Sequence, residues 1–453
     1  MRNALGVALT VLVLCAAAAG DERMDLRRDA VVTAVEKSST AVVNISTEKV
    51  VQRGFFFHEN SPFSDPMFDQ FMRQFSRPEI ANSLGSGGIF TPDGFIFTNA
   101  HVVNRASKIM VTLSDGSQYP ADLVNVDVAN DLAVIKIQAD RPLSALVLGR
   151  SDDLMVGEKS IAVGNPFGLS NTVTQGVISA LHRDVVVQDR VMFKDILQTD
   201  ALINPGNSGG PLLNLFGEVI AVTTAMRADA AGIGFAIPVD RVKRSLAALL
   251  DYKKLKRLQL GLELKEKYTG QGADAILTVA KAEKGGPAAK AGLAGGDVIV
   301  ELGGRRIKTL VDFMAAVLVT EGKPMTVKAE RGGSTIEGVI APTVIPKPDG
   351  AKLAREMMGL SVQQMVRTLA RDVGVNIDKG ILIADVAKGS TGEAGELARG
   401  DVILQVNDTL TADMETFATA LEAAADADKV YLVILRREGM AVTQYAAEVA
   451  VKH

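Results

Sequence analysis

The chain has 453 residues, about three times the roughly 150 residues expected for one domain, so two to four domains are anticipated. Hydrophobic residues make up 47% and charged residues 23%, a globular balance that excludes a disordered or fibrous chain. A net charge of −4 argues against a broad nucleic-acid-binding surface, and the single cysteine excludes a disulfide framework and a cysteine-built metal site.

The first twenty residues predict a cleaved secretory signal. Arg2 supplies the basic start, an apolar stretch follows over residues 4–19, and small alanines at its end provide a cleavage site. That stretch is shorter than the ~20 apolar residues that a membrane span needs. Lipid attachment at Cys15 is a further alternative, but the bulky Leu14 stands where that signal requires a small residue. We therefore expect residues 1–19 to be removed, which leaves a mature chain without cysteine and without a stable membrane span.

Residues from about 30 to 238 predict many short strands without helices between them. Two Asp-Gly pairs, Asp93-Gly94 and Asp115-Gly116, lie between β-rich runs and indicate hairpin turns. Strands at this spacing favour an antiparallel sandwich or barrel over a parallel sheet with crossover helices. The clearest strands are expected at residues 41–46, 109–113 and 132–137.

Residues 55–78 interrupt this pattern. They are rich in Phe yet broken by Pro, Ser and Asp, with no clear period. The stretch is either a surface loop or an interaction arm, because so many aromatic side chains rarely face water without a partner. The residues by themselves leave both interpretations open.

An amphipathic helix is predicted over residues 239–257, where the β-rich region ends. Its apolar positions recur at helical spacing, so one face should pack against the preceding strands. These positions are Val242, Leu246, Leu249 and Leu250.

The last two hundred residues contain an internal repeat. The pattern around Asp297 recurs at Asp401, and Phe313 recurs at Phe417, both with an offset of 104 residues. In each copy a strand, a turn and a helix follow the aspartate. Two domains of about 90 residues are therefore expected, joined by a linker at residues 346–350.

Ser208 is the candidate nucleophile. Gly206, Gly209 and Gly210 surround it and permit backbone geometries in which neighbouring amides converge on one oxygen. Such an oxyanion hole contributes roughly 10²–10³ in rate per donor. The stretch also fits the nucleophile elbow of α/β-hydrolases, but that fold needs a histidine after the serine. Because only the terminal His453 follows, the elbow interpretation fails.

The general base must then lie upstream of the serine. Of the remaining histidines, His58 belongs to the Phe-rich stretch, and His182 is expected at the polar start of a turn. His101 is expected at the end of an apolar strand, where its ring would be held rigidly. Asp131 opens a buried strand and can orient the imidazole. The order His101, Asp131, Ser208 is that of chymotrypsin.

At this point the chain is seen to resemble the HtrA/Deg family of exported serine proteases. The matching segments are residues 84–89 (LGSGGI), 98–103 (TNAHVV), 130–134 (NDLAV), 164–169 (GNPFGL) and 199–212 (TDALINPGNSGGPL), and the repeated C-terminal region resembles tandem PDZ domains. The resemblance implies a mainly β protein: a trypsin-like double β-barrel domain over residues 20–255, a first PDZ domain over 256–345 and a second over 355–453. It also implies a regulatory loop at about residues 52–82.

The resemblance further implies the roles of the site residues. His101 would be the general base, Asp131 its orienting acid and Ser208 the nucleophile, with the amides of Gly206 and Ser208 forming the oxyanion hole. The S1 pocket would be lined by Ile233 and Phe235 and accept small aliphatic residues. In the PDZ domains, peptide carboxylates would bind at Leu260, Gly261 and Leu262 in the first copy and at Gly359 and Leu360 in the second.

The expected activity is that of an ATP-independent serine endoprotease in the periplasm, acting on unfolded or misfolded proteins. The PDZ domains would recruit substrate C-termini, and the chain would assemble as a homotrimer and larger oligomers. No cofactor, no metal and no nucleic-acid partner are expected. The competing class is a binding protein, a chaperone or PDZ scaffold whose protease domain is idle. The complete triad argues against that alternative.

Overall fold

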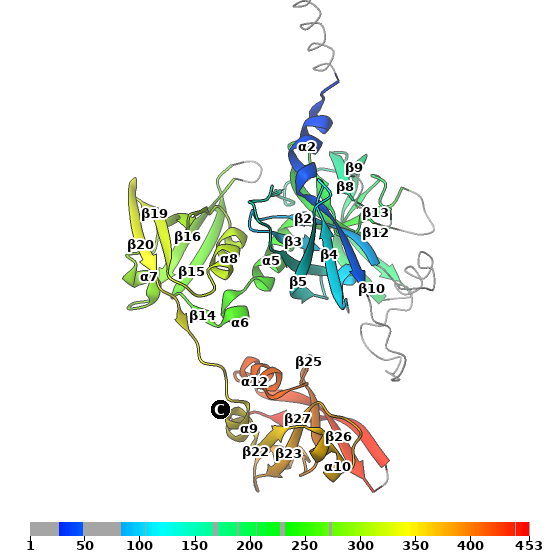
Figure 1. Ribbon diagram of the computed structural model, residues 1–453, viewed down its shortest axis with the longest axis vertical. Helices are drawn as coiled ribbons and strands as arrows, with labels where there is room; N and C mark the ends of the chain where they lie inside the picture. The colour runs from blue at the N-terminus through cyan, green and yellow to red at the C-terminus, as the bar shows by residue number, and fades with distance from the viewer. Residues whose placement is uncertain are drawn as a thin grey trace, which may run out of the picture. The chain divides into compact units, whose positions relative to one another are not determined.

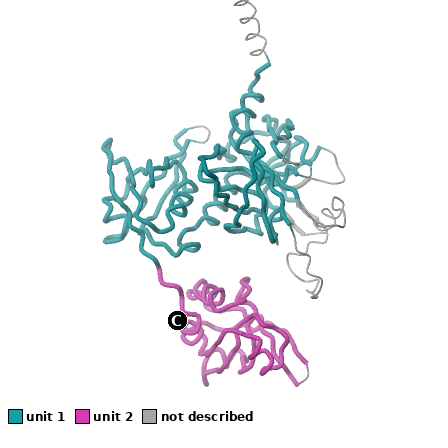
Figure 2. The backbone as a smooth tube through the Cα atoms, viewed as in Figure 1, with its two compact units in different colours: residues 1–344 teal, residues 345–453 magenta. Residues whose placement is uncertain are grey.

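The computed structural model describes residues 27–48, 83–104, 106–165, 171–187, 190–204, 206–226, 232–270, 274–439 and 441–452. The chain divides into two compact units, residues 1–344 and 345–453 (Figure 2). The predicted leader at residues 1–19 and the predicted regulatory loop at about residues 52–82 lie outside the described residues.

The first part of the larger unit is a closed antiparallel barrel, in the order β1-β2-β3-β6-β5-β4 (Figure 1). A helix α2 and a short 3₁₀ helix precede it. Both predicted Asp-Gly turns are confirmed, since Asp93-Gly94 joins β2 to β3 and Asp115-Gly116 joins β4 to β5. The elements are α2 Ala30–Ser38, η1 Ser39–Ala41, β1 Val42–Glu48, β2 Ser83–Ile89, β3 Phe95–Thr98, β4 Lys108–Thr112, β5 Gln118–Asp127 and β6 Leu132–Ile137.

A second sheet follows, in the order β11-β8-β9-β10-β13-β12-β7. Because β11 pairs with both β8 and β12, six of its strands close into a ring, and β7 adds to β12 in parallel. The predicted double barrel is confirmed by this second ring. Its strands are β7 Val147–Leu148, β8 Lys159–Gly164, β9 Thr172–Val187, β10 Arg190–Thr199, β11 Pro211–Leu213, β12 Glu218–Met226 and β13 Gly234–Pro238.

The helix predicted over residues 239–257 is two helices, α5 Val239–Leu249 and α6 Tyr252–Lys256. The break lies at Asp251, whose carboxylate accepts a hydrogen bond from the amide of Lys253 and so starts a new helix. A single helical period does not reveal this cap, which is why the prediction of one continuous helix was wrong. The predicted apolar face is correct, and its four residues are buried.

The first PDZ domain is a six-stranded sheet in the order β15-β16-β17-β19-β20, with β18 paired to β17, and a separate β14–β21 pair. Helix α8 packs against α5 and α6 of the protease domain, where the rings of Tyr252 and Phe313 are 6.4 Å apart. The elements are β14 Leu258–Gln259, β15 Leu262–Tyr268, β16 Ala275–Ala282, α7 Pro287–Lys290, β17 Val298–Leu302, β18 Arg305–Arg306, α8 Leu310–Val319, β19 Met325–Arg331, β20 Ser334–Ile340 and β21 Thr343–Val344.

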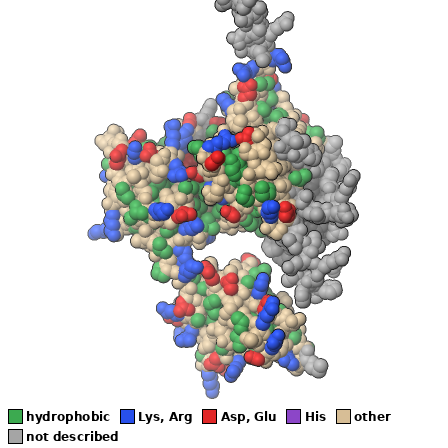
Figure 3. Space-filling view, viewed as in Figure 1, with side chains coloured by type: hydrophobic (Ala, Val, Ile, Leu, Met, Phe, Trp, Pro, Cys, Tyr) green, Lys and Arg blue, Asp and Glu red, His purple; other side chains and the backbone are tan. Residues whose placement is uncertain are grey.

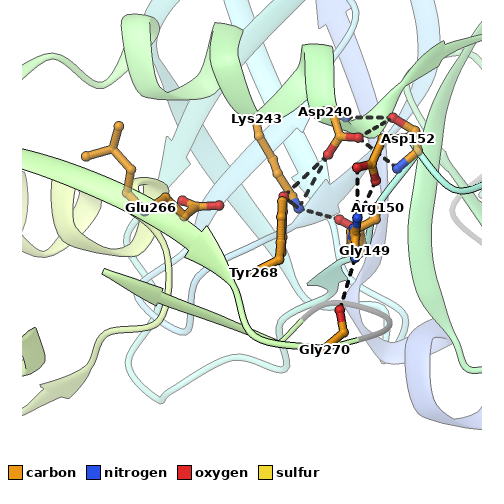
Figure 4. Close-up of polar contacts among 10 residues, drawn as sticks. Gly149, Arg150, Asp152, Asp240, Lys243, Glu266, Tyr268 and Gly270 are labelled. Atoms are coloured by element: carbon orange, nitrogen blue, oxygen red, sulfur yellow. Dashed lines mark hydrogen bonds and ion pairs between the residues drawn. The ribbon is translucent and has the colours of Figure 1, made fainter. Parts of the chain in front are cut away.

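A buried lysine joins this PDZ domain to the protease domain (Figure 4). Lys243 on α5 donates hydrogen bonds to the carbonyl of Gly149 and, over 2.6 Å, to the hydroxyl of Tyr268 on β15. Its burial lowers the pKa of its ammonium group. Arg150 lies over the ring of Tyr268, 4.7 Å from its centre, and donates to the carbonyl of Gly270. The two domains therefore share a polar network and form one compact unit.

A second ion pair joins the same two domains at the β2–β3 turn. The guanidinium of Arg305 on β18 donates to both carboxylate oxygens of Asp93, over 2.7 and 2.6 Å. This two-bond geometry is the strongest arrangement that an arginine and a carboxylate adopt.

The unit of residues 345–453 repeats the PDZ architecture, with the sheet order β22-β23-β24-β26-β27 and β25 added to β24. The predicted repeat is thereby confirmed: Asp297 and Asp401 are both buried and paired with Arg331 and Arg436. The elements are α9 Gly350–Met358, β22 Leu360–Gln364, α10 Arg367–Val373, β23 Ile381–Val386, α11 Thr391–Ala394, β24 Val402–Val406, β25 Thr409–Leu410, α12 Met414–Ala423, β26 Lys429–Glu438 and β27 Ala441–Ala450.

On the face drawn in Figure 3, the described Lys and Arg side chains are interspersed with Asp and Glu side chains. This mixture fits the near-neutral net charge. Among the described helices, none is both long and apolar enough to cross a membrane.

Candidate active site

Ser208 lies in a tight loop, residues 206–210, that leads into β11 of the second barrel; we call it the serine loop. Its Oγ donates to the carbonyl of Thr224 on β12, over 3.3 Å. The backbone of Thr223 fixes the loop from one side, since its carbonyl accepts from the amide of Gly209 and its amide donates to the carbonyl of Gly210. The nucleophile is thus held against β12, the second strand after it in the chain.

Glycine is required in the serine loop because the first barrel approaches it closely. A Cβ added to Gly209 would lie 2.4 Å from both the carbonyl oxygen of Ser86 and the Oγ1 of Thr98, and the backbone of Gly209 has φ +82°. A Cβ on Gly210 would lie 2.6 Å from the carbonyl oxygen of Val163. A larger residue at Gly209 would push the first barrel away from the serine loop, and one at Gly210 would clash with β8 of the second barrel itself.

His101 and Asp131 come together at the end of the first barrel. His101 lies in the short helix α4 (Ala100–Val103), just beyond β3, rather than on the strand end that its sequence neighbours suggested. Its Nδ1 is 2.9 and 3.0 Å from the two carboxylate oxygens of Asp131, and its backbone amide donates to the same carboxylate. Both side chains are largely buried, with 15% and 11% exposed.

Asp131 has a backbone in the left-handed region, with φ +51°, directly before β6. For a residue other than glycine this conformation costs of order 1 kcal/mol or more and persists only where its surroundings hold it. Asn99 supplies part of that support, because its Nδ2 donates to the carbonyl of Asp131 over 2.9 Å.

Thr224 is a site residue that the sequence did not point out. Its Oγ1 donates to the carboxylate of Asp131 over 2.7 Å, and its carbonyl is the acceptor for Ser208. It therefore connects the acid on the first barrel to the nucleophile on the second. The sequence feature that could have pointed to Thr224 is a pair of hydroxyl residues, Thr223 and Thr224, inside an otherwise apolar strand.

The prediction that His182 lies at the start of a turn was wrong. His182 lies within β9 rather than at the start of a turn, with φ +55°. Its Nδ1 is 2.6 Å from the carboxylate of Asp195 on β10, which also has a positive φ and lies at an irregularity in the strand pairing. The hydrogen bond from His182 lowers the pKa of Asp195. The polar residues mark a strand bulge, which a single sequence does not distinguish from a turn.

Of the two predicted S1 residues, Phe235 lies beside the strand whose Thr224 contacts Ser208. Phe235 is buried on β13, where it pairs with Ala225 of β12, next to Thr224. Ile233 precedes that strand and is half-buried.

The two predicted carboxylate loops differ. In the first PDZ domain, Gly261 has φ +68°, and the carbonyls of Leu260 and Gly261 accept from the amides of Ala288 and Glu283. In the second, Gly359 follows helix α9 directly, and its amide donates to the carbonyl of Arg355 as the helix cap. The amide of Gly359, a candidate donor to a peptide carboxylate, is therefore already bonded within the second domain.

Comparison with known proteins agrees with this architecture. Residues 85–222 match the model of the trypsin-like peptidase domain, and residues 259–340 and 382–436 each match a PDZ domain model. The chain is 40% identical over 388 residues to a probable periplasmic serine endoprotease DegP-like of Chlamydia trachomatis, covering 82% of this chain and 77% of the relative.

Two further relatives have the same character. The chain is 34% identical to the periplasmic pH-dependent serine endoprotease DegQ of Escherichia coli, with 82% of each covered. It is 40% identical to the putative serine protease HhoB of Synechocystis, covering 70% of this chain and 80% of that one. With a two-barrel protease domain, two PDZ domains and relatives matched over most of their length, the chain belongs to the HtrA/Deg family of serine endoproteases.

Proposed function

We propose that this serine endopeptidase is an exported, ATP-independent protease that degrades unfolded or misfolded proteins with a His101–Asp131–Ser208 triad. One observation supports this most. The carboxylate of Asp131 accepts hydrogen bonds from His101 on the first barrel and from Thr224 on the second, and the carbonyl of Thr224 receives the hydroxyl of Ser208.

Each residue then has a defined step. Ser208 Oγ attacks the carbonyl carbon of the peptide bond while His101 Nε2 takes its proton. Asp131 holds Nδ1–H, so the other ring nitrogen faces the reaction, and its negative charge stabilises the imidazolium. His101 then protonates the leaving amine, the C–N bond breaks, and a water molecule hydrolyses the acyl-enzyme by the reverse sequence of proton transfers.

The amides of Gly206 and Ser208 are proposed to stabilise the negative charge that develops on the substrate oxygen by donating hydrogen bonds to it. Gly206 has φ +101°, a conformation that favours glycine, and it precedes the nucleophile by two residues. Each preorganised donor of this kind lowers the barrier by about 3 kcal/mol.

Substrate selection is assigned to two surfaces. Ile233 and Phe235 supply an apolar S1 lining without an acidic group, which favours cleavage after small aliphatic residues over cleavage after Lys or Arg. The PDZ domains take up chain ends by strand addition and regulate the protease, with Leu260, Gly261 and Leu262 the primary carboxylate site. In the second domain the corresponding residues are Gly359 and Leu360, a weaker sequence match to such a loop. The active assembly is a homotrimer or larger oligomer in the periplasm.

The triad is tested with Ser208→Ala. Casein degradation should be abolished, while the variant still binds unfolded chains, because only the nucleophile has been removed. Degradation at a rate close to that of the wild type would refute the triad.

Labelling with a fluorophosphonate separates the protease from an idle scaffold. We expect covalent labelling of Ser208 in the folded wild-type protein and none in Ser208→Ala. A wild-type protein that stays unlabelled even with an activating peptide would instead be a chaperone or PDZ scaffold. Sequencing the N-terminus of the exported protein, with light scattering for its size, tests leader cleavage and assembly.

A further inference from the structure

Ser86 is a fully buried residue of β2 that spans the interface between the two barrels. Its amide donates to the carbonyl of Ser208 over 2.8 Å, and its Oγ donates to the carbonyl of Gly206 over 2.5 Å. The same Oγ accepts from the amide of Asn165 over 2.8 Å, and its carbonyl accepts from the Oγ1 of Thr98. One residue of the first barrel therefore binds the serine loop at two points.

The hydroxyl of Ser86 has a fixed direction. Since the amide of Asn165 can only donate, the Oγ must accept from it, and the single hydroxyl proton is left for the carbonyl of Gly206. Both partners are buried, so neither can turn to water when this bond is lost. A buried polar group left without a partner costs about 1–3 kcal/mol.

These two bonds hold the part of the chain that carries the proposed oxyanion donors. The carbonyls of Gly206 and Ser208 are fixed to Ser86, so the backbone between them is held at both ends. Gly206, with no side chain and a positive φ, has a wider choice of alternative conformations than a residue with a Cβ. A rotation there would turn an amide away from the substrate oxygen, and the bond from Ser86 Oγ opposes it.

Asn165 adds a second connection between the barrels. Its carbonyl accepts from the Nδ2 of Asn44 on β1 over 2.7 Å, while its amide binds Ser86. Because β1 and β2 belong to the barrel that carries His101, the position of the serine loop is set relative to the base. The close approach of Gly209 and Gly210 to Ser86 makes these short bonds possible.

We propose that Ser86 is a positioning residue for catalysis, whose hydroxyl holds the serine loop in the conformation that binds the oxyanion. This inference rests on the proposed function, since it assumes that Gly206 and Ser208 supply the donors. Ser86 contacts neither substrate nor the reacting atoms and acts through Gly206.

The test is Ser86→Ala, with Ser160→Ala as the matched control. Ser160 is also fully buried, and its hydroxyl is hydrogen-bonded to Thr199 within the second barrel, outside the serine loop. Both variants remove one buried hydroxyl group. Thermal unfolding measures the structural cost of each, so that cost can be separated from catalysis.

For Ser86→Ala we expect kcat on a peptide substrate to fall by about 10²-fold with KM changed by less than about threefold. The affinity for a peptide aldehyde, whose adduct carries the oxyanion, should fall by the same factor as kcat/KM. The acid limb of the pH–rate profile should keep its midpoint, because His101 and Asp131 retain their partners. Ser160→Ala should keep kcat within about threefold.

The proposal is overturned if Ser86→Ala keeps its kcat, if Ser160→Ala loses as much activity, or if aldehyde affinity is unchanged while kcat falls. Should Ser86→Ala not fold, Ser86→Cys replaces it; its weaker S–H donor predicts a smaller loss, again confined to kcat. An unlabelled, inactive wild-type protein would instead refute the proposed function. An active wild type alongside an active Ser86→Ala would refute only the role of Ser86.

Discussion

The two PDZ domains have the same sheet order and the same buried Asp–Arg pair, yet one is integrated with the protease domain and the other forms a compact unit of its own. The two copies differ at a residue that makes a contact with the protease domain. Arg305, which binds Asp93, corresponds to Thr409 in the repeat offset of 104, and threonine cannot form that ion pair. With the same fold, the first PDZ domain therefore has a contact to the protease domain that the equivalent residue of the second cannot make.

The first strands differ as well. In the first PDZ domain, β15 continues to Tyr268, which meets Lys243. In the second, β22 ends at Gln364, and helix α10 begins at Arg367. The edge that carries the docking tyrosine in one domain is replaced by a helix in the other.

Of the substitutions considered, Lys243→Met should weaken the contact between the first PDZ domain and the protease domain most. The variant keeps the apolar stem but leaves the hydroxyl of Tyr268 and the carbonyl of Gly149 without their charged donor, which should cost about 2 kcal/mol. Hydrogen exchange should accelerate in the first PDZ domain and stay unchanged in the second. The matched control is Lys352→Met, which removes an exposed lysine in the second unit. Unaltered exchange in the first domain would show that Lys243 does not hold it.

Arg305→Ala should weaken the same contact less, by about 1 kcal/mol, because the ion pair of Arg305 with Asp93 is only partly buried. A double-mutant cycle with Asp93→Ala measures the coupling, which should decrease as salt is added. Arg367→Ala is the control, since its pair with Asp378 is exposed in the second unit. Additive effects of the two substitutions at low salt would contradict a docking role.

Tyr445→Phe should have the smallest effect: it should lower the free energy of unfolding of the second PDZ domain by about 0.5–1 kcal/mol. Its hydroxyl donates to Asp401 over 3.2 Å, and burial together with that carboxylate raises its pKa to about 12. A raised folded-state pKa stabilises the domain below the unfolded value of about 10, and this contribution is lost as pH rises through about 12.

The stability difference between wild type and Tyr445→Phe should therefore be constant at neutral pH and shrink at alkaline pH. Denaturant unfolding across the pH range measures it, and phenolate absorbance follows the titration. A difference that grows above pH 10 would have the wrong sign for this hydrogen bond.

Much of the architecture follows from local patterns. Asp-Gly turns and short apolar strands predict an antiparallel sandwich or barrel, and the 104-residue offset predicts two similar C-terminal domains. The second barrel and the PDZ fold are predicted only through the resemblance to the HtrA/Deg family. The order of His101, Asp131 and Ser208 likewise predicts which side chains meet. The break at Asp251 and the bulge at His182 could not be predicted, since a cap or bulge has the same residue preferences as a turn.

Long-range contacts explain the rest of what the sequence does not reveal. Ser86 and Gly206 are 120 residues apart, and Asp131 and Thr224 are 93 apart. Neither Ser86 nor Thr224 differs from an ordinary strand residue until the barrels are in contact. Their roles depend on the partner barrel, which no periodicity describes.

These sequence separations also determine how late in the synthesis of the chain an active protease can form. The strand that carries Thr224 is the last to reach the proposed triad, and it must close against residues made far earlier, a slow kind of contact to form. A partly made or partly unfolded copy holds no assembled nucleophile and cannot cut its neighbours. For a protease proposed to remove unfolded chains, a copy whose barrels have separated has changed from enzyme to substrate.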